Sequence, residues 1–173
     1  LKEHLGIEPG RKVLITVGSL IPRKDVETVI KGFKGYSYND KDAILLVVGD
    51  GFCRTQLETM SHSNIKFLGN ITNVLEYLQV SDCFISAALS EGLPNTVLEA
   101  MACGLPTVLS YIGPHRELSG QDGMYFERGN ANQLIDQLMN YSTHTNNSRN
   151  IVEILSAEIM SNKYQELYLE RVQ

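Results

Sequence analysis

The sequence has no tryptophan, only three cysteines, and no apolar run near the roughly 20 residues that a membrane-spanning helix needs. Cys53, Cys83 and Cys103 lie far apart, without CxxC spacing or neighbouring histidines, which argues against disulfide and zinc frameworks. We interpret them as small buried side chains in a reducing compartment. The opening residues LKEHLGIEPGRK lack the apolar segment of a signal peptide, so we expect neither membrane insertion nor secretion.

Positive charge is also scarce. Fifteen Lys and Arg residues stand against 20 Asp and Glu residues, which gives a net charge of -5 with both signs scattered along the chain. No basic face is available to neutralise a nucleic-acid backbone, so we expect no nucleic-acid partner. The four histidines are dispersed, and we predict no metal site. A hydrophobic content of 43% suits one globular domain over residues 1–173.

Short β-branched runs alternate with helical patterns along the chain. We predict strands over residues 13–18, 43–49, 65–69, 83–88, 106–110 and 124–127, and helices over residues 24–36, 56–61, 72–80, 95–103 and 130–141. The first two strand runs are continuously apolar, as in parallel strands that are covered on both faces. This pattern predicts an α/β fold with a doubly wound parallel sheet of about six strands and helices on both faces. Residues 142–150 are predicted as a polar linker before terminal helices.

The loops that follow the predicted strands locate the expected ligand site. Six-stranded sheets of this kind most commonly have the order 3-2-1-4-5-6 and bind ligands at the carboxyl ends of the strands, between the first and the fourth. GSLIPRK, residues 18–24, follows the first strand, and AALSEGLPN, residues 87–95, follows the fourth. We therefore expect these two loops to face each other across a crevice.

The stretch VGDGF, which contains Gly49, superficially resembles a dinucleotide-binding fingerprint. The pattern G-x-G-x-x-G fails because its third glycine would be residue 54, which is Arg54. Two interpretations stay open. The glycines form a tight turn between strand and helix, or they line a wall against which a ligand lies, since backbone without side chains permits close approach.

Arg23 and Lys24 stand at the start of a predicted helix, whose amino end already carries positive partial charge. One interpretation is a solvated surface pair of Lys24 and Asp25. The alternative is that both cations, together with the amides of the helix, bind an anion as large as a pyrophosphate.

The stretch SEGLPNTVLEAMA carries two carboxylates. Pro94 suits the first position of a helix, which places free backbone amides of residues 95–97 at the mouth of the crevice. Glu99 lies more than a turn into that helix, on one face with Asn95 and Ala102. It either faces solvent on an amphipathic helix or accepts hydrogen bonds from the two hydroxyls of a vicinal diol. With Glu91 on the other side of an anion site, the arrangement suggests a nucleotide sugar as ligand.

These residues resemble a known family. EGLPNTVLEAMACGLPTV, residues 91–108, is similar to the E-x7-E signature of the retaining glycosyltransferases of family 4. Further segments resemble that family in the same order: VGSLIPRKDVETVIKGF, LLVVGDG, IKFLGNITNVLEYLQVSDCFIS, IGPHREL and DGMYFERGN. The resemblance extends from about Val13 to Gln137.

The resemblance implies a GT-B fold, in which two Rossmann-like domains enclose a cleft. This chain would be the carboxyl-terminal half, which binds a nucleotide-diphosphate sugar, either a UDP- or a GDP-sugar, and needs no further cofactor. The amino-terminal half, which binds the acceptor, would be absent, and the isolated domain would be inactive. The whole enzyme would move a hexosyl or N-acetylhexosaminyl group to a glycan or lipid-linked acceptor in bacterial surface polysaccharide or glycoconjugate synthesis. We expect it in the cytoplasm, where the absent half could hold it at the inner face of the membrane.

Site residues also follow from the resemblance. It implies that Glu91 is catalytic and contacts the transferred sugar, that Glu99 binds the ribose, and that no metal ion takes part. The other expected donor-binding residues are Gly18, Ser19, Arg23, Lys24, Gly49, Asn70, Ile71, Gly92, Leu93, Pro94, Asn95 and Thr96.

Two positions depart from the family pattern. Ser19 stands where many members have a phosphate-binding arginine, and either Arg23 or the absent half has to supply that charge. Tyr111 stands where an acidic residue often follows the fifth strand, and the sequence offers no explanation for it. Two alternatives remain: a non-catalytic nucleotide-sugar-binding or interaction module, and half of a GT-B epimerase acting on UDP-N-acetylglucosamine.

Overall fold

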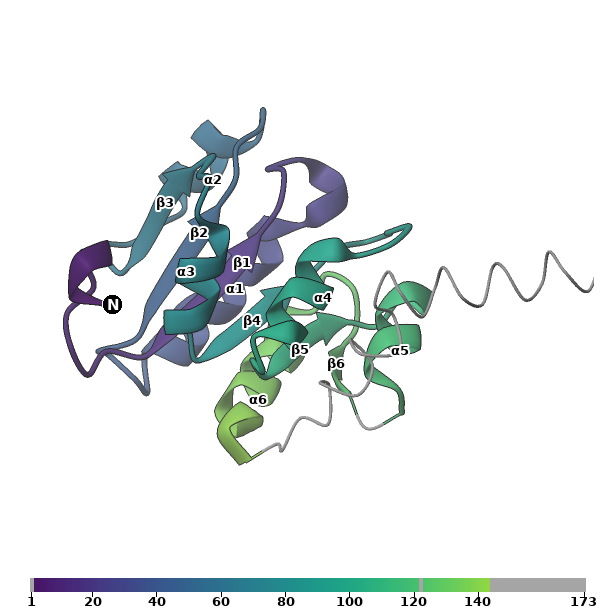
Figure 1. The fold of residues 1–173 in the computed structure, drawn as a ribbon. Helices are drawn as coiled ribbons and strands as arrows, with labels where there is room; N and C mark the ends of the chain where they lie inside the picture. Colours follow the sequence, from purple (N-terminus) through teal and green to yellow (C-terminus); the bar gives the residue numbers. More distant parts are fainter. Residues whose placement is uncertain (1, 122, 144–173) are drawn as a thin grey trace, which may run out of the picture.

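The computed structural model describes residues 2–121 and 123–143, which form one six-stranded parallel sheet (Figure 1). The strand order is β3-β2-β1-β4-β5-β6. The strands are β1 (Val13–Val17), β2 (Ile44–Val48), β3 (Ile65–Gly69), β4 (Cys83–Ser86), β5 (Thr107–Ser110) and β6 (Met124–Phe126). This is the order 3-2-1-4-5-6 that the sequence predicts, and the fold is α/β and Rossmann-like.

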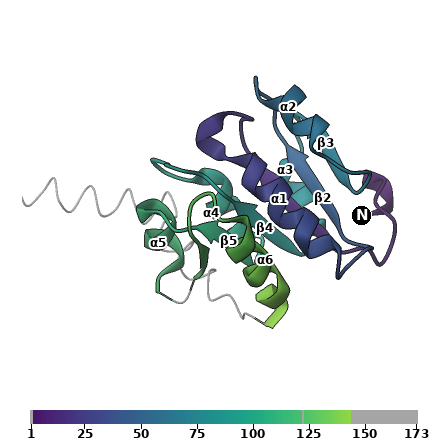
Figure 2. The ribbon, with the colours of Figure 1, turned by 180° about the vertical axis from the view of Figure 1, so that it is seen from behind.

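Helices cover both faces of the sheet (Figures 1 and 2). One face packs against α1 (Val26–Ser37), α2 (Arg54–Thr59) and α6 (Ala131–Asn140), and the other against α3 (Val74–Val80), α4 (Asn95–Ala102) and α5 (Gly113–Ser119). Three short 3₁₀ helices complete the described chain: η1 (Glu3–Leu5), η2 (Pro22–Lys24) and η3 (Tyr141–Thr143).

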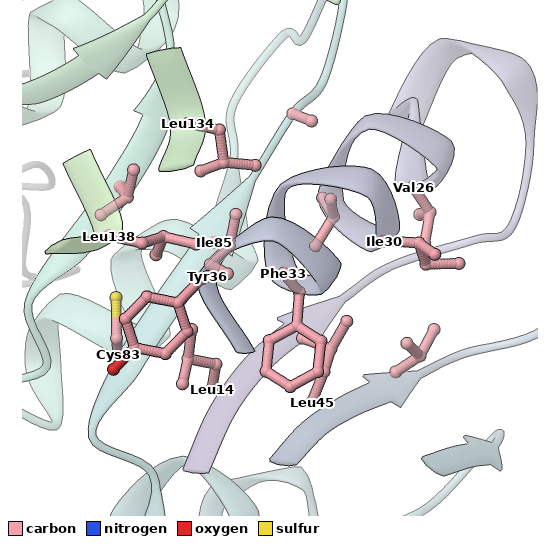
Figure 3. Close-up of a cluster of buried hydrophobic side chains, with 14 of the residues drawn as sticks. Leu14, Val26, Ile30, Phe33, Tyr36, Leu45, Cys83, Ile85, Leu134 and Leu138 are labelled. Carbon is pink, nitrogen blue, oxygen red and sulfur yellow. The ribbon is translucent and has the colours of Figure 1, made fainter. Parts of the chain in front are cut away.

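The two faces of the sheet have separate hydrophobic cores because successive strand residues point in opposite directions. In β1, Leu14 belongs to the core under α1 and α6, while Val13 and Ile15 belong to the core under α3 and α4. Figure 3 shows the first core, where Phe33 and Tyr36 of α1 lie close to Leu14 and other strand side chains. Burial on both faces explains why the sequences of β1 and β2 are continuously apolar.

Helices α1 and α6 lie side by side over the first core. Gly32 and Gly35 of α1 face Leu134 and Ile135 of α6, and a Cβ atom at either glycine would overlap those side chains. The two glycines therefore allow α6 to approach α1 closely and to bury Leu134 completely.

The structure corrects two predicted elements near the site. Asp25 separates η2 from α1 with a positive φ of 46°, so the helix begins at Val26 and Arg23 and Lys24 lie before it. The Asp25 carboxylate caps α1 by accepting hydrogen bonds from the amide and hydroxyl of Thr28. The sequence does not predict helix α5, because the Gly113–Pro114 pair with which it begins is typical of a turn.

Two further predictions concern the polar linker and the three cysteines. Within the predicted linker, residues 142 and 143 belong to η3, and the remainder and the expected terminal helices lie outside the described residues. Cys83 is buried, whereas Cys53 and Cys103 are half-buried, so only the first fits the predicted burial fully. All three are free thiols.

Candidate active site

Backbone contacts hold the loops after β1, β2 and β3 against one another. The Gly18 amide donates to the carbonyl of Val48 (2.9 Å), and the Gly49 amide donates to the carbonyl of Gly69 (2.8 Å). Gly49 has a φ of 121°, and a Cβ atom there would clash with the carbonyl oxygen of Gly18. We call Gly18, Gly49 and Gly69 the glycine row. The tight-turn interpretation accounts for Gly49 without a ligand.

The loops after β1 and β4 meet at the carboxyl edge of the sheet, where the strand order predicts a crevice. Nη1 of Arg23 lies 3.2 Å from Oε2 of Glu91 and donates to the carbonyl of Ser90 (3.0 Å). Nζ of Lys24 pairs with Oε1 of Glu91. The amide of Leu89 donates to the carbonyl of Arg23 (2.8 Å). Each carboxylate oxygen of Glu91 therefore has its own cation.

The Glu91 ion pairs are unequally exposed. The side chain of Glu91 is 7% exposed and that of Lys24 is 19% exposed, whereas Arg23 is 49% exposed. The Lys24 side chain passes beside Gly18, whose missing Cβ would lie 3.5 Å from Lys24 Cε. A carboxylate this poorly hydrated is stable because cations neutralise it. The two cations in turn are occupied by Glu91.

A polar layer of Ser86, Ser110 and His115 lies at the carboxyl ends of β4 and β5. Ser110 Oγ donates to the carbonyl of Ala88 (2.6 Å), which anchors the loop that carries Glu91. His115 Nδ1 lies 2.9 Å from the carbonyl oxygen of Ser110. Because a carbonyl only accepts, Nδ1 carries the proton, and Nε2 is left as an acceptor 3.5 Å from Ser86 Oγ.

Burial lowers the pKa of His115, whose ring is fully inaccessible. The hydrogen bond to Ser110 and the charge of Glu91 raise the pKa by smaller amounts, and Lys24 lowers it. His115 is therefore neutral at pH 7. The sequence does not by itself identify Ser86, Ser110 and His115 as members of the site. Two sequence segments could have indicated the polar layer: the apolar strands CFIS and TVLS each end in a serine.

The start of α4 differs from the prediction. Pro94 is the residue before the helix, and the chain turns back on itself there, so the amide of Asn95 donates to Leu93 (3.0 Å) and that of Val97 to Pro94 (3.0 Å). These two amides are not free. Within the described part of the chain, the amides of Gly92, Leu93 and Thr96 donate no hydrogen bond. The open amides thus lie partly before the helix.

Glu99 lies on the exposed face of α4 together with Asn95 and Ala102, as the spacing predicts. The structure gives it no ion pair with any residue in the described ranges. Both interpretations of Glu99, solvent-facing and diol-binding, require this exposure.

The remaining predicted residues lie at the same edge but do not converge on Glu91. Asn70 is exposed after β3, whereas Ile71 is half-buried and packs against the second core. Ser19 is exposed, and its carbonyl accepts from the amide of Ile21 (2.9 Å). Gly92 and Leu93 are exposed beside the buried Pro94.

Residues 2–121 and 123–143 contain neither a metal-binding group of side chains nor a membrane-spanning helix. No group of three or more His, Cys, Asp or Glu side chains there is arranged to hold a metal ion. No helix in these ranges is both long and apolar enough to cross a membrane.

Comparison with known proteins identifies the family. The family model described as Glycosyl transferases group 1 matches residues 11–144. The N-acetyl-alpha-D-glucosaminyl L-malate synthase of Bacillus anthracis is 31% identical over 186 residues, which cover 98% of this chain and 48% of that enzyme. The alpha-monoglucosyldiacylglycerol synthase of Streptococcus pneumoniae is 28% identical and covers 99% of this chain and 42% of that enzyme. This chain therefore spans less than half the length of these two relatives.

Solved structures agree with the fold. The crystal structure of HepE from Anabaena in complex with UDP-glucose matches with a TM-score of 0.83 at 18% identity, covering 98% of this chain and 51% of that one. A likeness at this identity shows the fold, here one half of a GT-B arrangement. Because the family model covers most of the sequence and a relative above 30% identity covers nearly all of it, the chain belongs to the group 1 glycosyltransferases, as a GT-B domain of the family 4 type.

Proposed function

We propose that this chain is the donor-binding half of a retaining glycosyltransferase, and that it binds the diphosphate of a nucleotide sugar between Lys24 and the start of α4. The observation that carries the proposal is the ion-pair group of Glu91, Arg23 and Lys24 at the point where the strand order reverses. Ligands of doubly wound sheets bind outside the carboxyl ends of the strands at this point.

The ion pairs suggest how a diphosphate would enter. Glu91 is the counter-ion of both cations, and a diphosphate brings more negative charge and more acceptor oxygens than one carboxylate. The cations would exchange Glu91 for phosphate oxygens, and the amides of Gly92, Leu93 and Thr96 would bind the distal phosphate. Glu91 would then be free to accept hydrogen bonds from hydroxyls of the transferred sugar. The chain's own cations and amides thus stabilise the leaving diphosphate.

The nucleoside end of the donor would lie along α4 and the loop after β3. Glu99, exposed more than a turn into α4, would accept hydrogen bonds from the ribose hydroxyls, and Asn70 would meet the base. UDP-glucose in the HepE structure supports a nucleotide sugar as the ligand class. We propose UDP- and GDP-sugars as the donors to test.

The whole enzyme would transfer a hexosyl or N-acetylhexosaminyl group with retention at the anomeric carbon, to a glycan or lipid-linked acceptor in bacterial glycoconjugate synthesis. The two relatives support this class, since one is named for a glucosaminyl group on malate and the other for a glucosyl group on diacylglycerol. The acceptor would be bound by the half that this chain does not include, so we expect residues 1–173 to bind nucleotides but not to transfer sugar.

Titration of the chain with UDP, GDP and their glucose and N-acetylglucosamine derivatives tests the proposal through backbone amide chemical shifts. We expect the amides of Lys24 and of the non-proline residues from Gly92 to Glu99 to shift at millimolar nucleotide. Glu99→Gln should weaken UDP binding by about tenfold, equivalent to about 1.4 kcal/mol. Glu117→Gln, an exposed glutamate on α5, is the matched control. Absence of any shift at Gly92 to Glu99 would overturn the proposal.

A further inference from the structure

Glu91 is part of the lining of a cavity of about 360 Å³, to which neither Arg23 nor Lys24 contributes. The loops after β4, β5 and β6 line it, with Leu89, Glu91, Tyr111 and Arg128 among its walls. In the strand order, β4 is flanked by β1 on one side and β5 on the other, so this cavity and the ion-paired cations lie on opposite sides of the β4 loop. We call it the β5 cavity. Its volume falls at the lower end of the range of about 300–1,000 Å³ for small-ligand pockets.

Tyr111 provides a fixed aromatic wall of the β5 cavity. Its ring packs edge-on against Tyr125, with centroids 5.6 Å apart, and the Arg116 guanidinium lies 4.9 Å from its centroid. Despite these contacts Tyr111 is 43% exposed. A tyrosine held in this way presents an apolar ring and a polar hydroxyl to the same ligand, which suits a sugar ring with its C–H and O–H groups.

Arg128 supplies an uncompensated positive charge to the β5 cavity. The other four described arginines have partners: Arg11 with Glu8, Arg23 with Glu91, Arg54 with Asp50 and Glu58, and Arg116 with Tyr111. Arg128 has no ion pair within residues 2–121 and 123–143. A guanidinium binds carboxylate and phosphate groups through two parallel hydrogen bonds. As long as no diphosphate has taken over Arg23 and Lys24, these two cations neutralise Glu91, and its charge does not oppose an anion here.

We infer that the β5 cavity binds a negatively charged hexose, with the sugar ring against Tyr111 and Leu89 and its carboxylate or phosphate group on Arg128. This inference rests on the proposed function and extends it to the class of sugar at the site. The anionic group has two chemical sources. It belongs to the sugar of the donor, as in a nucleotide hexuronic acid, or to a phosphorylated sugar of an acceptor that is held by the absent half and reaches into this cavity.

The experiment titrates the chain with two compounds whose sugar carries a negative charge and with two counterparts whose sugar is neutral. Glucose 6-phosphate is compared with glucose, and UDP-glucuronic acid with UDP-glucose, while the Tyr111 amide and the Arg128 Nε–H are followed by NMR. We expect saturable shifts at Tyr111 and Arg128 with at least one compound whose sugar is charged, and no shift at Arg128 with either counterpart whose sugar is neutral. Saturation by glucose 6-phosphate assigns the anion to the acceptor, and saturation by UDP-glucuronic acid alone assigns it to the donor.

Arg128→Gln should weaken the affinity for the compound with the charged sugar by at least about tenfold, which corresponds to about 1.4 kcal/mol. Tyr111→Ala should also weaken it. Lys41→Gln is the charge-matched control, because Lys41 is exposed and has no ion pair within the described ranges. The inference is overturned if neither compound with a charged sugar gives a saturable shift, if glucose shifts the same residues equally, or if the Lys41 variant loses as much affinity.

The proposal for the β5 cavity and the proposal for the donor site can be refuted independently of each other. Binding of UDP alone should be the same in the Arg128 variant and in the unchanged chain, with shifts at Gly92 to Glu99. Absence of those shifts in the unchanged chain would overturn the proposed function, while the glucose 6-phosphate titration would still decide whether the β5 cavity binds an anionic sugar.

Discussion

Two carboxylates at opposite ends of β4 connect it to β1, and they do so by different means. Asp82, before β4, accepts a hydrogen bond from the backbone amide of Val13 (2.7 Å), and its Oδ2 lies 3.5 Å from Nζ of Lys2. Glu91, after β4, accepts from the side chains of Arg23 and Lys24. A backbone donor stays where the strand is, whereas a side-chain cation can rotate to another partner. Asp82 therefore fixes the strand pair, whereas the partners of Glu91 are side chains that can rotate away, as the proposed exchange with a diphosphate requires.

Burial does not distinguish these two roles. The side chain of Glu91 is 7% exposed and that of Asp82 is 41% exposed, yet the more exposed carboxylate is the one with the permanent partner. Exposure alone therefore does not show which of these two carboxylates is held by a backbone donor.

The largest loss of stability should come from a substitution in the glycine row, which holds the loops after β1, β2 and β3 together. Gly49→Ala forces a Cβ atom into the carbonyl of Gly18 and places alanine at a φ of 121°. We expect a loss of about 3 kcal/mol or more in the free energy of unfolding, measured by urea denaturation. Gly92→Ala is the control, because a Cβ there meets nothing within 4 Å, and it should change stability by no more than about 0.5 kcal/mol. Equal losses in the two variants would show that steric overlap is not the cause.

The next largest loss of stability should come from removing the carboxylate of Asp82, which accepts a hydrogen bond from the backbone amide of Val13. Asp82→Ala leaves the amide of Val13, a completely buried residue, without its side-chain acceptor, and should cost about 2 kcal/mol. Asp82→Asn keeps an acceptor oxygen and should recover most of that loss in the same urea denaturation experiment. If the two variants are equally unstable, the charge on Asp82, rather than the hydrogen bond to Val13, is what stabilises the strand pair.

Removing the charge of Glu91 should leave stability nearly unchanged and alter binding instead. Glu91→Gln frees Arg23 and Lys24 from a competing carboxylate, so UDP affinity should rise about fivefold, equivalent to about 1 kcal/mol. The free energy of unfolding should fall by less than about 1 kcal/mol, because Arg23 reaches water. Calorimetric titration with UDP measures the first change. A fall in UDP affinity would contradict the exchange of partners at Glu91.

The smallest effect concerns the polar layer between the two loops. Burial lowers the pKa of His115 in the folded chain, so below about pH 6.5 the unfolded chain binds a proton that the folded chain does not. Stability should therefore fall as the pH drops through this range. His115→Gln should show a flatter dependence of unfolding free energy on pH. His62→Gln, which alters an exposed histidine, should keep the original slope. A slope that is the same in both variants would assign the pH dependence to other groups.

The sequence predicted the features that depend on local patterns and on general rules of topology. Apolar runs and their spacing identified all six strands, and the usual strand order placed the loops containing Arg23 and Glu91 opposite each other. The helical spacing likewise identified the exposed face of α4 that carries Glu99.

Features that depend on particular three-dimensional contacts were not predicted. The pairing of Glu91 with both cations joins residues 67 and 68 positions apart. The turn at Pro94 occupies the amide of Asn95, and the positive φ of Asp25 ends η2, although a proline or an aspartate at such a place is compatible with several backbone paths. The polar layer around His115 forms only when two strand ends come together.

The glycine row at the ends of β1, β2 and β3 has a consequence for how this protein can evolve. Glu91 and Glu99 are the carboxylates that we propose contact the donor, and we expect Glu99, which is exposed, to accept other amino acids without loss of the fold. Gly49 supplies no functional group, and its backbone geometry admits almost no replacement. We therefore expect Gly49 to accept fewer substitutions during evolution than the side chains around it. The residues that contact a ligand can then change while the backbone of the glycine row stays the same.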